Sequence, residues 1–258
     1  MNNNKPIGIF DSGIGGTSIW KEIHQLMPKE NTIYLADSKN APYGQKNKDE
    51  IIALSIKNTE LLLSLDCKTI VVACNTATTN AIKVLRSLYK IPFIGIEPAI
   101  KPAATNSKTQ TIGILATQGT LNSELFVESS ERFNQTKIIE QVGNGLVQLI
   151  ENGALDSKEM FCLLEQYLKP MIAANIDYLV LGCSHYPYLI PQIEKILPKN
   201  IKIIDSGEAV AKQTKNIIEK IGFNSNEFGG ITQFFTNTKS NVLENIIGSE
   251  YIVSFLDF

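Results

Sequence analysis

The sequence has few of the residues that mark disulfide-rich, metal-binding or membrane-spanning proteins. Its 258 residues include only four cysteines and two histidines. Four thiols in a chain of this length predict reduced cysteines, and two imidazoles are too few for the usual zinc sites, so we expect no metal. Residues 1–6 are polar, and no run approaches the roughly 18 apolar residues of a membrane span. These absences predict a cytoplasmic protein without a membrane partner.

The sequence also lacks an excess of charge of either sign. Lysine and arginine total 24, aspartate and glutamate total 26, and the formal net charge is −2. Because nucleic-acid binding depends on clustered basic residues, this balance predicts no nucleic-acid partner. Hydrophobic residues make up 43% of the chain, which is enough to bury one large core or two smaller ones.

Nucleotide-binding glycine motifs are absent as well. Residues 11–16 read Asp-Ser-Gly-Ile-Gly-Gly, but their spacing fits neither the dinucleotide fingerprint nor a P-loop with its lysine. A glycine-rich turn before a helix can still offer backbone N–H groups to a small carboxylate. Asp11, at the end of the preceding apolar run, either orients a substrate ammonium or tunes a thiol, or simply caps the helix.

The sequence does contain a regular alternation of short apolar runs and amphipathic stretches. The apolar runs lie at 7–10, 32–36, 69–73 and 92–96, and again at 111–116, 137–142, 177–182 and 201–204. Helical periodicity lies between and after them, at 17–27, 49–65, 76–88, 121–133, 188–197 and 208–221. This order predicts an α/β fold with mostly parallel sheets covered by helices.

The restart of the pattern predicts two similar βαβ-type domains related by a pseudo-two-fold axis. Later apolar runs at 231–235 and 251–256 are expected to return to the first domain. The expected division is 1–98 plus 206–258 for the first domain and 99–205 for the second. In such a pair the carboxyl ends of both sheets face a shared cleft, where open α/β sheets bind ligands.

Two cysteines occupy matching places in these halves. Cys74 follows the run 69–73, and Cys183 follows the run 177–182. A thiolate can remove a proton and a thiol can return one, so two cysteines flanking a stereocentre can deprotonate one face and reprotonate the other. The pair therefore predicts racemisation. Both precede helical patterns, and a helix N-terminus is expected to lower the pKa of each thiol.

The remaining cysteines and the first histidine are interpreted as structural. Cys67 and Cys162 have ordinary apolar neighbours and are expected to pack as small hydrophobic residues. His24 lies in an amphipathic stretch and is expected on the surface or in packing.

Polar residues next to the two matched cysteines complete a candidate site. Asn75 and Thr76 follow Cys74, while Ser184 and His185 follow Cys183, at expected helix starts where a carboxylate can bind. His185 is expected to assist Cys183 as an acid or base. Weaker candidates are Thr117, Thr120 and Glu151. The turn that contains Pro42, Tyr43 and Gly44 either lines the cleft or only reverses the chain.

Four segments together resemble the bacterial glutamate racemases of the cofactor-independent aspartate/glutamate racemase family. They are Ile-Phe-Asp-Ser-Gly-Ile-Gly-Gly at 9–16, Ala-Pro-Tyr-Gly at 41–44, Ala-Cys-Asn-Thr-Ala at 73–77 and Leu-Gly-Cys-Ser-His-Tyr-Pro at 181–187. The resemblance implies interconversion of L- and D-glutamate without pyridoxal phosphate or metal, and a supply of D-glutamate for peptidoglycan in the cell wall. It also implies a homodimer.

The resemblance carries roles for individual residues. Cys74 matches the cysteine that acts on the D-isomer, and Cys183 matches the one that acts on the L-isomer. The matching substrate contacts are Asp11 and Ser12, Tyr43 and Gly44, Asn75 and Thr76, and Ser184 and His185, with Glu151 and Thr117 as further contributors. Ser184 stands where the family usually has threonine. The hydroxyl is kept and a methyl group is lost, so we expect activity to survive.

Two other interpretations stay open at this stage. The chain could racemise aspartate or another amino acid, which a substrate panel distinguishes. It could also be a two-lobed binding protein with inert cysteines. Thiol reactivity that substrate protects would argue against that second interpretation.

Overall fold

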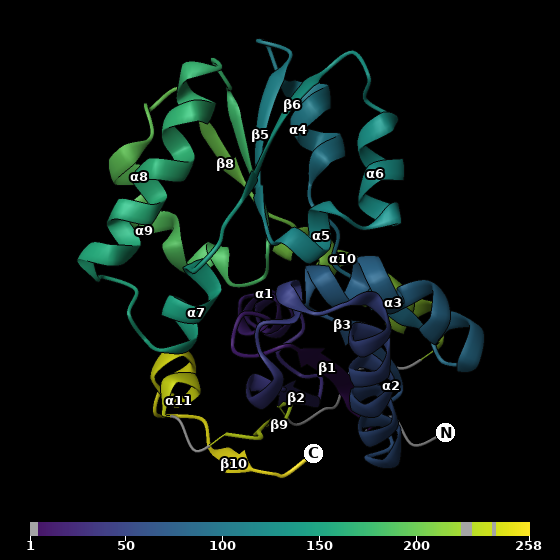
Figure 1. The fold of residues 1–258 in the computed structure, drawn as a ribbon. Coiled ribbons are helices and arrows are strands. Elements are labelled where there is room, and N and C mark those ends of the chain that lie inside the picture. The colour runs from purple at the N-terminus through teal and green to yellow at the C-terminus, as the bar shows by residue number, and fades with distance from the viewer. Residues whose placement is uncertain (1–4, 223–228, 239–240) are drawn as a thin grey trace.

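The computed structural model describes residues 5–222, 229–238 and 241–258. These residues form two separate sheets flanked by helices, one in each half of the molecule (Figure 1). The first sheet has the order β10-β9-β2-β1-β3-β4 and the second has the order β6-β5-β7-β8. Every strand pair among the described residues is parallel. The expected α/β fold with parallel sheets is confirmed.

The strands and helices alternate along the chain. The strands are β1 (Ile7–Asp11), β2 (Thr32–Ala36), β3 (Thr69–Val72), β4 (Phe93–Gly95), β5 (Thr111–Ala116), β6 (Lys137–Val142), β7 (Tyr178–Gly182), β8 (Lys202–Ile204), β9 (Thr232–Thr236) and β10 (Val253–Phe255). The α-helices are α1 (Thr17–Leu26), α2 (Lys48–Ser64), α3 (Asn75–Leu88), α4 (Ile100–Asn106), α5 (Gln118–Leu121), α6 (Glu124–Glu131), α7 (Leu146–Glu151), α8 (Lys158–Ala173), α9 (Ile190–Ile196), α10 (Gly207–Lys220) and α11 (Val242–Ile247). Short 3-10 turns are η1 (Ser38–Asn40), η2 (Tyr43–Gln45) and η3 (Tyr186–Leu189).

The two sheets repeat one strand order. In the first sheet β2-β1-β3-β4 are neighbours, and in the second β6-β5-β7-β8 follow the same sequence of steps. β3 and β7 therefore occupy equivalent positions, each beside the first strand of its half. Since Cys74 and Cys183 follow these two strands, the thiols lie at matching carboxyl ends of matching sheets.

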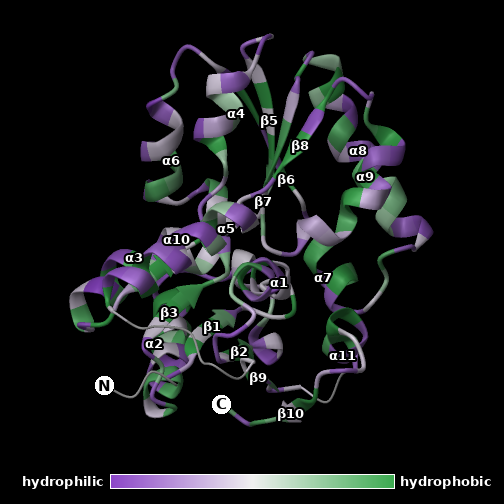
Figure 2. Ribbon diagram, turned by 180° about the vertical axis from the view of Figure 1, so that it is seen from behind, coloured by the Kyte–Doolittle hydropathy of each residue, from purple (hydrophilic) through white to green (hydrophobic). Residues whose placement is uncertain are grey.

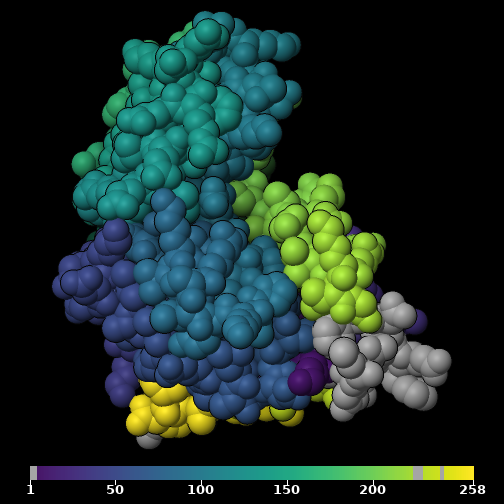
Figure 3. All heavy atoms as spheres, turned by 90° about the vertical axis from the view of Figure 1, so that its right-hand side faces the viewer, coloured from purple at the N-terminus to yellow at the C-terminus, as the bar shows by residue number. Residues whose placement is uncertain are grey.

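Both ends of the chain contribute to the first sheet. β9 pairs with β2, and β10 extends the same sheet beyond β9. In Figure 3 the lower part of the molecule shows the purple and blue of the early residues together with the yellow-green and yellow of the late ones. The two segments that connect the halves lie side by side, because Ser206 Oγ donates a hydrogen bond to the Glu97 carbonyl at 2.5 Å.

Burial on both faces explains the composition of the strands. All five residues of β1 and all six of β5 are buried, so these strands read as continuous apolar runs without alternation. Figure 2 shows hydrophobic residues in green along much of the central strands, and helices in which hydrophobic and hydrophilic residues alternate. One apolar cluster includes Ile9 and Val71 of the first sheet and Leu115 and Leu179 of the second, so the halves share part of a core.

Two helix predictions needed correction. The helix expected over 121–133 is divided, because Ser123 accepts a hydrogen bond from the Phe126 N–H and starts α6 after α5 has ended. The helix expected from residue 188 begins at Ile190 and is preceded by η3. Cys183 is therefore followed by a 3-10 turn, and only Cys74 directly precedes an α-helix.

The other cysteines and the first histidine have separate outcomes. All four thiols are free, as expected. Cys67 is buried and packs against Gly8, as predicted. Cys162 is exposed on α8, so the prediction that Cys162 packs as a small hydrophobic residue was wrong. His24 stacks on Trp20 with ring centroids 5.1 Å apart, which fits a packing role. Over the described residues, the helices are too short or too polar for any to span a bilayer.

Candidate active site

Cys74 is fixed by the start of α3. β3 ends at Val72, and Cys74 occupies the position before the helix, where its Sγ accepts a hydrogen bond from the Ala77 N–H at 3.4 Å. The thiol lies 3.7 Å from Ser12 Oγ. Burial, followed by the charge of Asp11, raises the pKa of Cys74, while the Ala77 N–H lowers it less than burial raises it. The expectation that the helix start would lower this pKa was wrong, because desolvation is the larger effect.

Cys183 is paired with the imidazole of His185. The Sγ lies 3.8 Å from His185 Nδ1, and the opposite ring nitrogen, Nε2, lies 2.6 Å from Glu151 Oε1. Burial lowers the pKa of His185, but the hydrogen bonds to Cys183 and Glu151 and the charge of Asp11 outweigh it, so the pKa lies well above its usual value.

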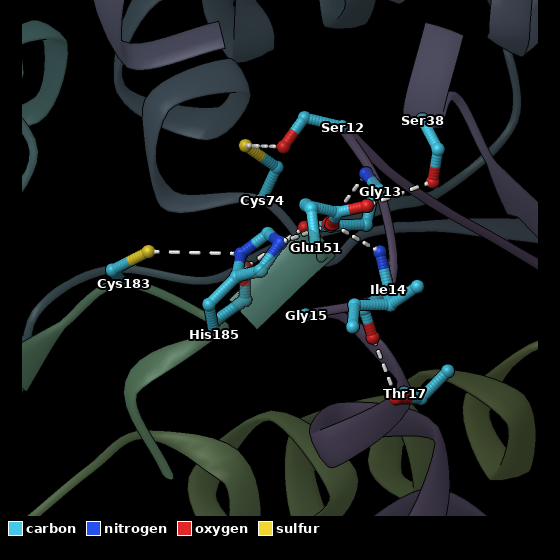
Figure 4. Close-up of polar contacts among 12 residues, drawn as sticks. Ser12, Gly13, Ile14, Gly15, Thr17, Ser38, Cys74, Glu151, Cys183 and His185 are labelled. Carbon is cyan, nitrogen blue, oxygen red and sulfur yellow. Dashed lines mark hydrogen bonds and ion pairs between the residues drawn. The ribbon is translucent and has the colours of Figure 1, made fainter. Parts of the chain in front are cut away.

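Glu151 connects the two halves at the glycine-rich turn. Its Oε1 also accepts a hydrogen bond from the Ile14 N–H at 2.7 Å, and its Oε2 accepts one from Ser38 Oγ at 3.0 Å (Figure 4). The turn therefore binds a carboxylate of the protein itself, whereas the sequence predicted that it binds the carboxylate of a ligand. A Cβ added to Gly13 would lie 2.0 Å from Glu151 Oε1, so only glycine fits there.

Asp11 also contributes to the contact between the two halves of the molecule. We call this contact the seam; in it residues 11–16 meet Glu151, Ser184 and His185. Its Oδ1 accepts a hydrogen bond from the Gly13 N–H at 2.9 Å, and its Oδ2 accepts one from the Ser184 hydroxyl at 2.8 Å. The carboxylate is fully buried, and burial raises its pKa to about 6 against the lowering effects of His185 and these two donors. Asp11 does not cap α1, whose capping position is Gly16. Of the roles expected for Asp11, tuning of Cys74 fits this geometry.

Threonines from both halves meet beside Cys74. The hydroxyl oxygens of Thr76, Thr117 and Thr120 form a triangle with separations of 2.8, 3.2 and 3.0 Å. Gly44 packs against this group, since an added Cβ would lie 2.6 Å from Thr117 Cβ. The structure therefore brings together Thr76, Thr117, Thr120 and Gly44, as the candidate site requires.

The side chain of Tyr43 does not point into the seam. Its hydroxyl donates a short hydrogen bond to Asp37 Oδ2 and accepts one from Asn58 Nδ2, and the ring is buried in the first half. The turn after Pro42 can therefore offer its backbone, but not the phenol, to a ligand. Of the two interpretations left open for this turn, lining of the cleft by the phenol does not fit the structure.

Asn75 is a buried polar side chain without a partner. Only 2% of its surface is exposed, and neither Nδ2 nor Oδ1 has a hydrogen-bond partner within the described part of the chain. Leaving such an amide unpaired costs about 1–3 kcal/mol. Asn75 is the first residue of α3 and follows Cys74 directly, so this unpaired amide lies next to one of the two thiols in the chain.

Sequence reasoning missed Ser38 and Asp37 as parts of the site. Both follow β2 directly, at the same edge of the first sheet as Ser12 and Cys74. A polar residue after a buried strand was the signal used for Cys74, and the same signal would have found these two. No group of three or more His, Cys, Asp or Glu side chains in residues 5–222, 229–238 and 241–258 is arranged to hold a metal ion.

Two parallel sheets that repeat one strand order, each with a buried thiol after its equivalent strand, fit the fold expected of a racemase. The chain belongs to the family described as Asp/Glu/Hydantoin racemase, which matches residues 7–214. It is 44% identical over 218 residues to the glutamate racemase of Ralstonia pickettii, covering 84% of this chain and 77% of that protein.

Solved structures agree with this assignment. A glutamate racemase isoform from Bacillus anthracis superposes with a TM-score of 0.89 and 30% identity, over 99% of this chain and 98% of that one. The glutamate racemase from Francisella tularensis, in complex with D-glutamate, has a TM-score of 0.85 and 27% identity, over 98% of both chains.

Proposed function

We propose that this protein is a glutamate racemase in which Cys74 and Cys183 exchange protons with the α-carbon of the substrate. The observation that carries the proposal is the position of two buried thiols at equivalent ends of β3 and β7. Besides burial and Asp11, the charge of Cys183 itself raises the pKa of Cys74, which supports a shared site. Glutamate is the substrate named for the relatives in both comparisons.

The reaction from L-glutamate uses Cys183 as the base. The Cys183 thiolate takes the α-proton, so an S–H bond forms as the C–H bond breaks, and the electron pair remains on the α-carbon. Cys74 then gives its proton to the opposite face, which yields D-glutamate and leaves the Cys74 thiolate. From D-glutamate, Cys74 removes the proton and Cys183 returns it.

The surroundings of the two thiols support this direction of proton flow. Burial raises the pKa of Cys74, which keeps its proton available for donation. His185, whose pKa is raised, places its Nδ1 3.8 Å from the Cys183 sulfur, within reach of a hydrogen bond to it. The buried setting keeps water from the carbanion-like state, which preorganised N–H and O–H donors must stabilise.

The carboxylates of glutamate find donors next to each thiol. We assign the unpaired Asn75 amide, the Thr76 hydroxyl and the backbone around Gly44 and Ser184 to this role, because the one proton of the Ser184 hydroxyl is donated to Asp11. Serine in place of the family's usual threonine at 184 keeps the donor, and its hydroxyl already binds Asp11 across the seam.

The same proposal covers the biological setting. The D-glutamate would serve peptidoglycan synthesis in the cytoplasm, and the protein would act as a homodimer. We assign 1–98 plus 206–258 to one domain and 99–205 to the other. The presence of β9 and β10 in the first sheet supports that division.

Purified protein incubated with L-glutamate in D2O tests the function. We expect loss of the α-proton signal by NMR together with decay of optical rotation, and we expect no decay of optical rotation in the Cys74→Ala and Cys183→Ala variants. Cys162→Ala, at an exposed thiol, is the matched control and should keep its rate. Reaction of aspartate alone would contradict the assigned substrate. Binding of glutamate without exchange would favour the binding-protein interpretation.

A further inference from the structure

Asn237 is a buried residue near the C-terminal end of the sequence, and it contacts a segment of the candidate site from the N-terminal part. It follows β9 and lies beyond residues 7–214, which the family description matches. Its Nδ2 donates to Asp37 Oδ1 at 2.5 Å and to the Phe258 carbonyl at 3.2 Å, and its Oδ1 accepts from the Lys39 N–H at 2.9 Å. Only 4% of the residue is exposed. All the polar atoms of this side chain are therefore used.

Asp37 is the main partner of Asn237 and the centre of a buried polar cluster. The carboxylate is fully buried. Its oxygens also accept hydrogen bonds from Asn40 Nδ2 at 2.7 Å and from the Tyr43 hydroxyl, and Lys57 Nζ lies 3.6 Å away. A buried carboxylate is tolerated only when such partners are in place. Asn237 thus fixes the position of the Asp37 carboxylate, and its bond to the Lys39 N–H fixes the backbone that follows Asp37.

The segment 37–44 contacts residues linked to each of the two thiols. Ser38 donates to Glu151, whose other oxygen binds the imidazole that faces Cys183. At its other end, Gly44 packs against Thr117, which is hydrogen-bonded to Thr76 on the helix that begins after Cys74. Anchoring this segment at Asp37 and Lys39 therefore bears on the geometry around both thiols.

We propose that Asn237 is a positioning residue for the racemase reaction, holding the segment 37–44 so that Ser38 meets Glu151 and Gly44 meets Thr117. The proposal rests on the proposed function, because it assigns Asn237 a role in that same site. Asn237 does not contact the thiols. Its effect passes through Asp37 and the backbone of Lys39.

Kinetics of Asn237→Ala in the full chain test the proposal. We expect kcat/KM to fall about tenfold in both directions, as for loss of a buried hydrogen bond to a charged group. Asn245→Ala is the matched control, because Asn245 is exposed on α11 in the same part of the chain. Circular dichroism at the assay temperature confirms that both variants are folded.

A double-mutant cycle separates positioning from a general loss of stability. If Asn237 acts through Ser38, the fold-decrease in kcat/KM of the double variant Asn237→Ala/Ser38→Ala should be smaller than the product of the fold-decreases of the two single variants. Asn237→Ala combined with Ser12→Ala, which alters a different segment beside Cys74, should show multiplied losses. Wild-type kinetics in Asn237→Ala, or multiplied losses in both cycles, would overturn the proposal.

The histidine NMR signals provide a readout that needs no turnover. The chain has only His24 and His185, so both imidazoles can be assigned. Ser38 donates a hydrogen bond to the carboxylate that faces His185, so displacing it leaves more negative charge on that carboxylate and should raise the pKa of His185 in Asn237→Ala, whereas Asn245→Ala should leave this pKa unchanged. An unmodified protein that is inactive on glutamate would contradict the proposed function. An unchanged His185 titration in Asn237→Ala would contradict the positioning role in either case.

Discussion

At the scale of single residues, Asp11 is held in its charged form against the effect of burial. Its pKa rises from 3.8 to about 6, so the folded state binds the proton more tightly than the unfolded state does. The buried charge therefore opposes folding above pH 6, and this cost disappears as the pH falls from 6 towards 4. The shift corresponds to about 3 kcal/mol at most.

Replacing Asp11 by asparagine should remove this pH dependence. The amide can accept from the Gly13 N–H and donate to the Ser184 hydroxyl, so the fold should be kept. Relative to the wild type, we expect the free energy of unfolding of Asp11→Asn to improve by about 1–1.5 kcal/mol between pH 5 and pH 8, since roughly half of the full effect is already present at pH 5. Urea denaturation across this range measures it. A difference that stays constant with pH would contradict the assigned burial effect.

His185 gives a second prediction at this scale. Because Glu151 is one of the groups that raise its pKa, Glu151→Gln should lower the pKa of His185 and slow proton removal from L-glutamate. Stability derived from the protonated imidazole is present below pH 6.5 and is lost as the pH rises through the folded-state pKa. NMR titration of the imidazole measures the shift. Glu165→Gln, on the exposed face of α8, serves as the control and should leave it unchanged.

Single residues also show how far the sequence predicts the site. Cys74 and Asn75 could be identified because polar residues directly after a buried strand meet at the carboxyl edge of a parallel sheet. The direction of the Cys74 pKa shift could not, because it depends on how deeply the thiol is buried. Glu151 remained a weak candidate, since its contact with Ile14 spans 137 residues and has no local signature.

At the scale of elements, the turn between β1 and α1 is shaped by the second half of the molecule. A Cβ on Gly15 would lie 2.1 Å from His185 Nδ1. The sequence predicted this turn, but its glycines were interpreted as anion donors, because the side chains that press on them come from distant segments. The division between α5 and α6 escaped prediction for a different reason, since helical periodicity continues through the cap at Ser123.

Gly15→Ala should therefore reduce catalytic activity more than it reduces the stability of the fold, because the added Cβ pushes against His185 where the two halves meet. We expect a fall in kcat/KM of at least about 100-fold, because displacement of His185 by even 1 Å disturbs the base at Cys183. Steady-state kinetics and a thermal unfolding curve measure the two effects separately. Gly229→Ala, where an added Cβ meets nothing within 4 Å, should match the wild type in both. Full activity in Gly15→Ala would show that His185 can move away from an added Cβ without harm to the reaction, and would contradict this prediction.

At the scale of the whole molecule, the proposed site takes residues from both halves, so a ligand there would bind both at once. Glutamate should therefore raise the unfolding temperature, since binding at 100 times Kd contributes about 2.7 kcal/mol to the folded state. Asn75→Ala should reduce this gain, because it removes the unpaired buried amide. Thermal unfolding with L-glutamate, D-glutamate and aspartate measures it. Equal stabilisation by aspartate would contradict selectivity for glutamate.

Because the first sheet is built from both ends of the chain, ribosomal synthesis imposes an order on the assembly of the site. β8 completes the second sheet before β9, Asn237 and β10 have been made. Translation proceeds at roughly 5–20 residues per second, and units fold as they emerge. A nascent chain therefore carries both cysteines for several seconds before Asp37 gains its last partner. Proton transfer should begin only after the last strands of the first sheet have left the exit tunnel.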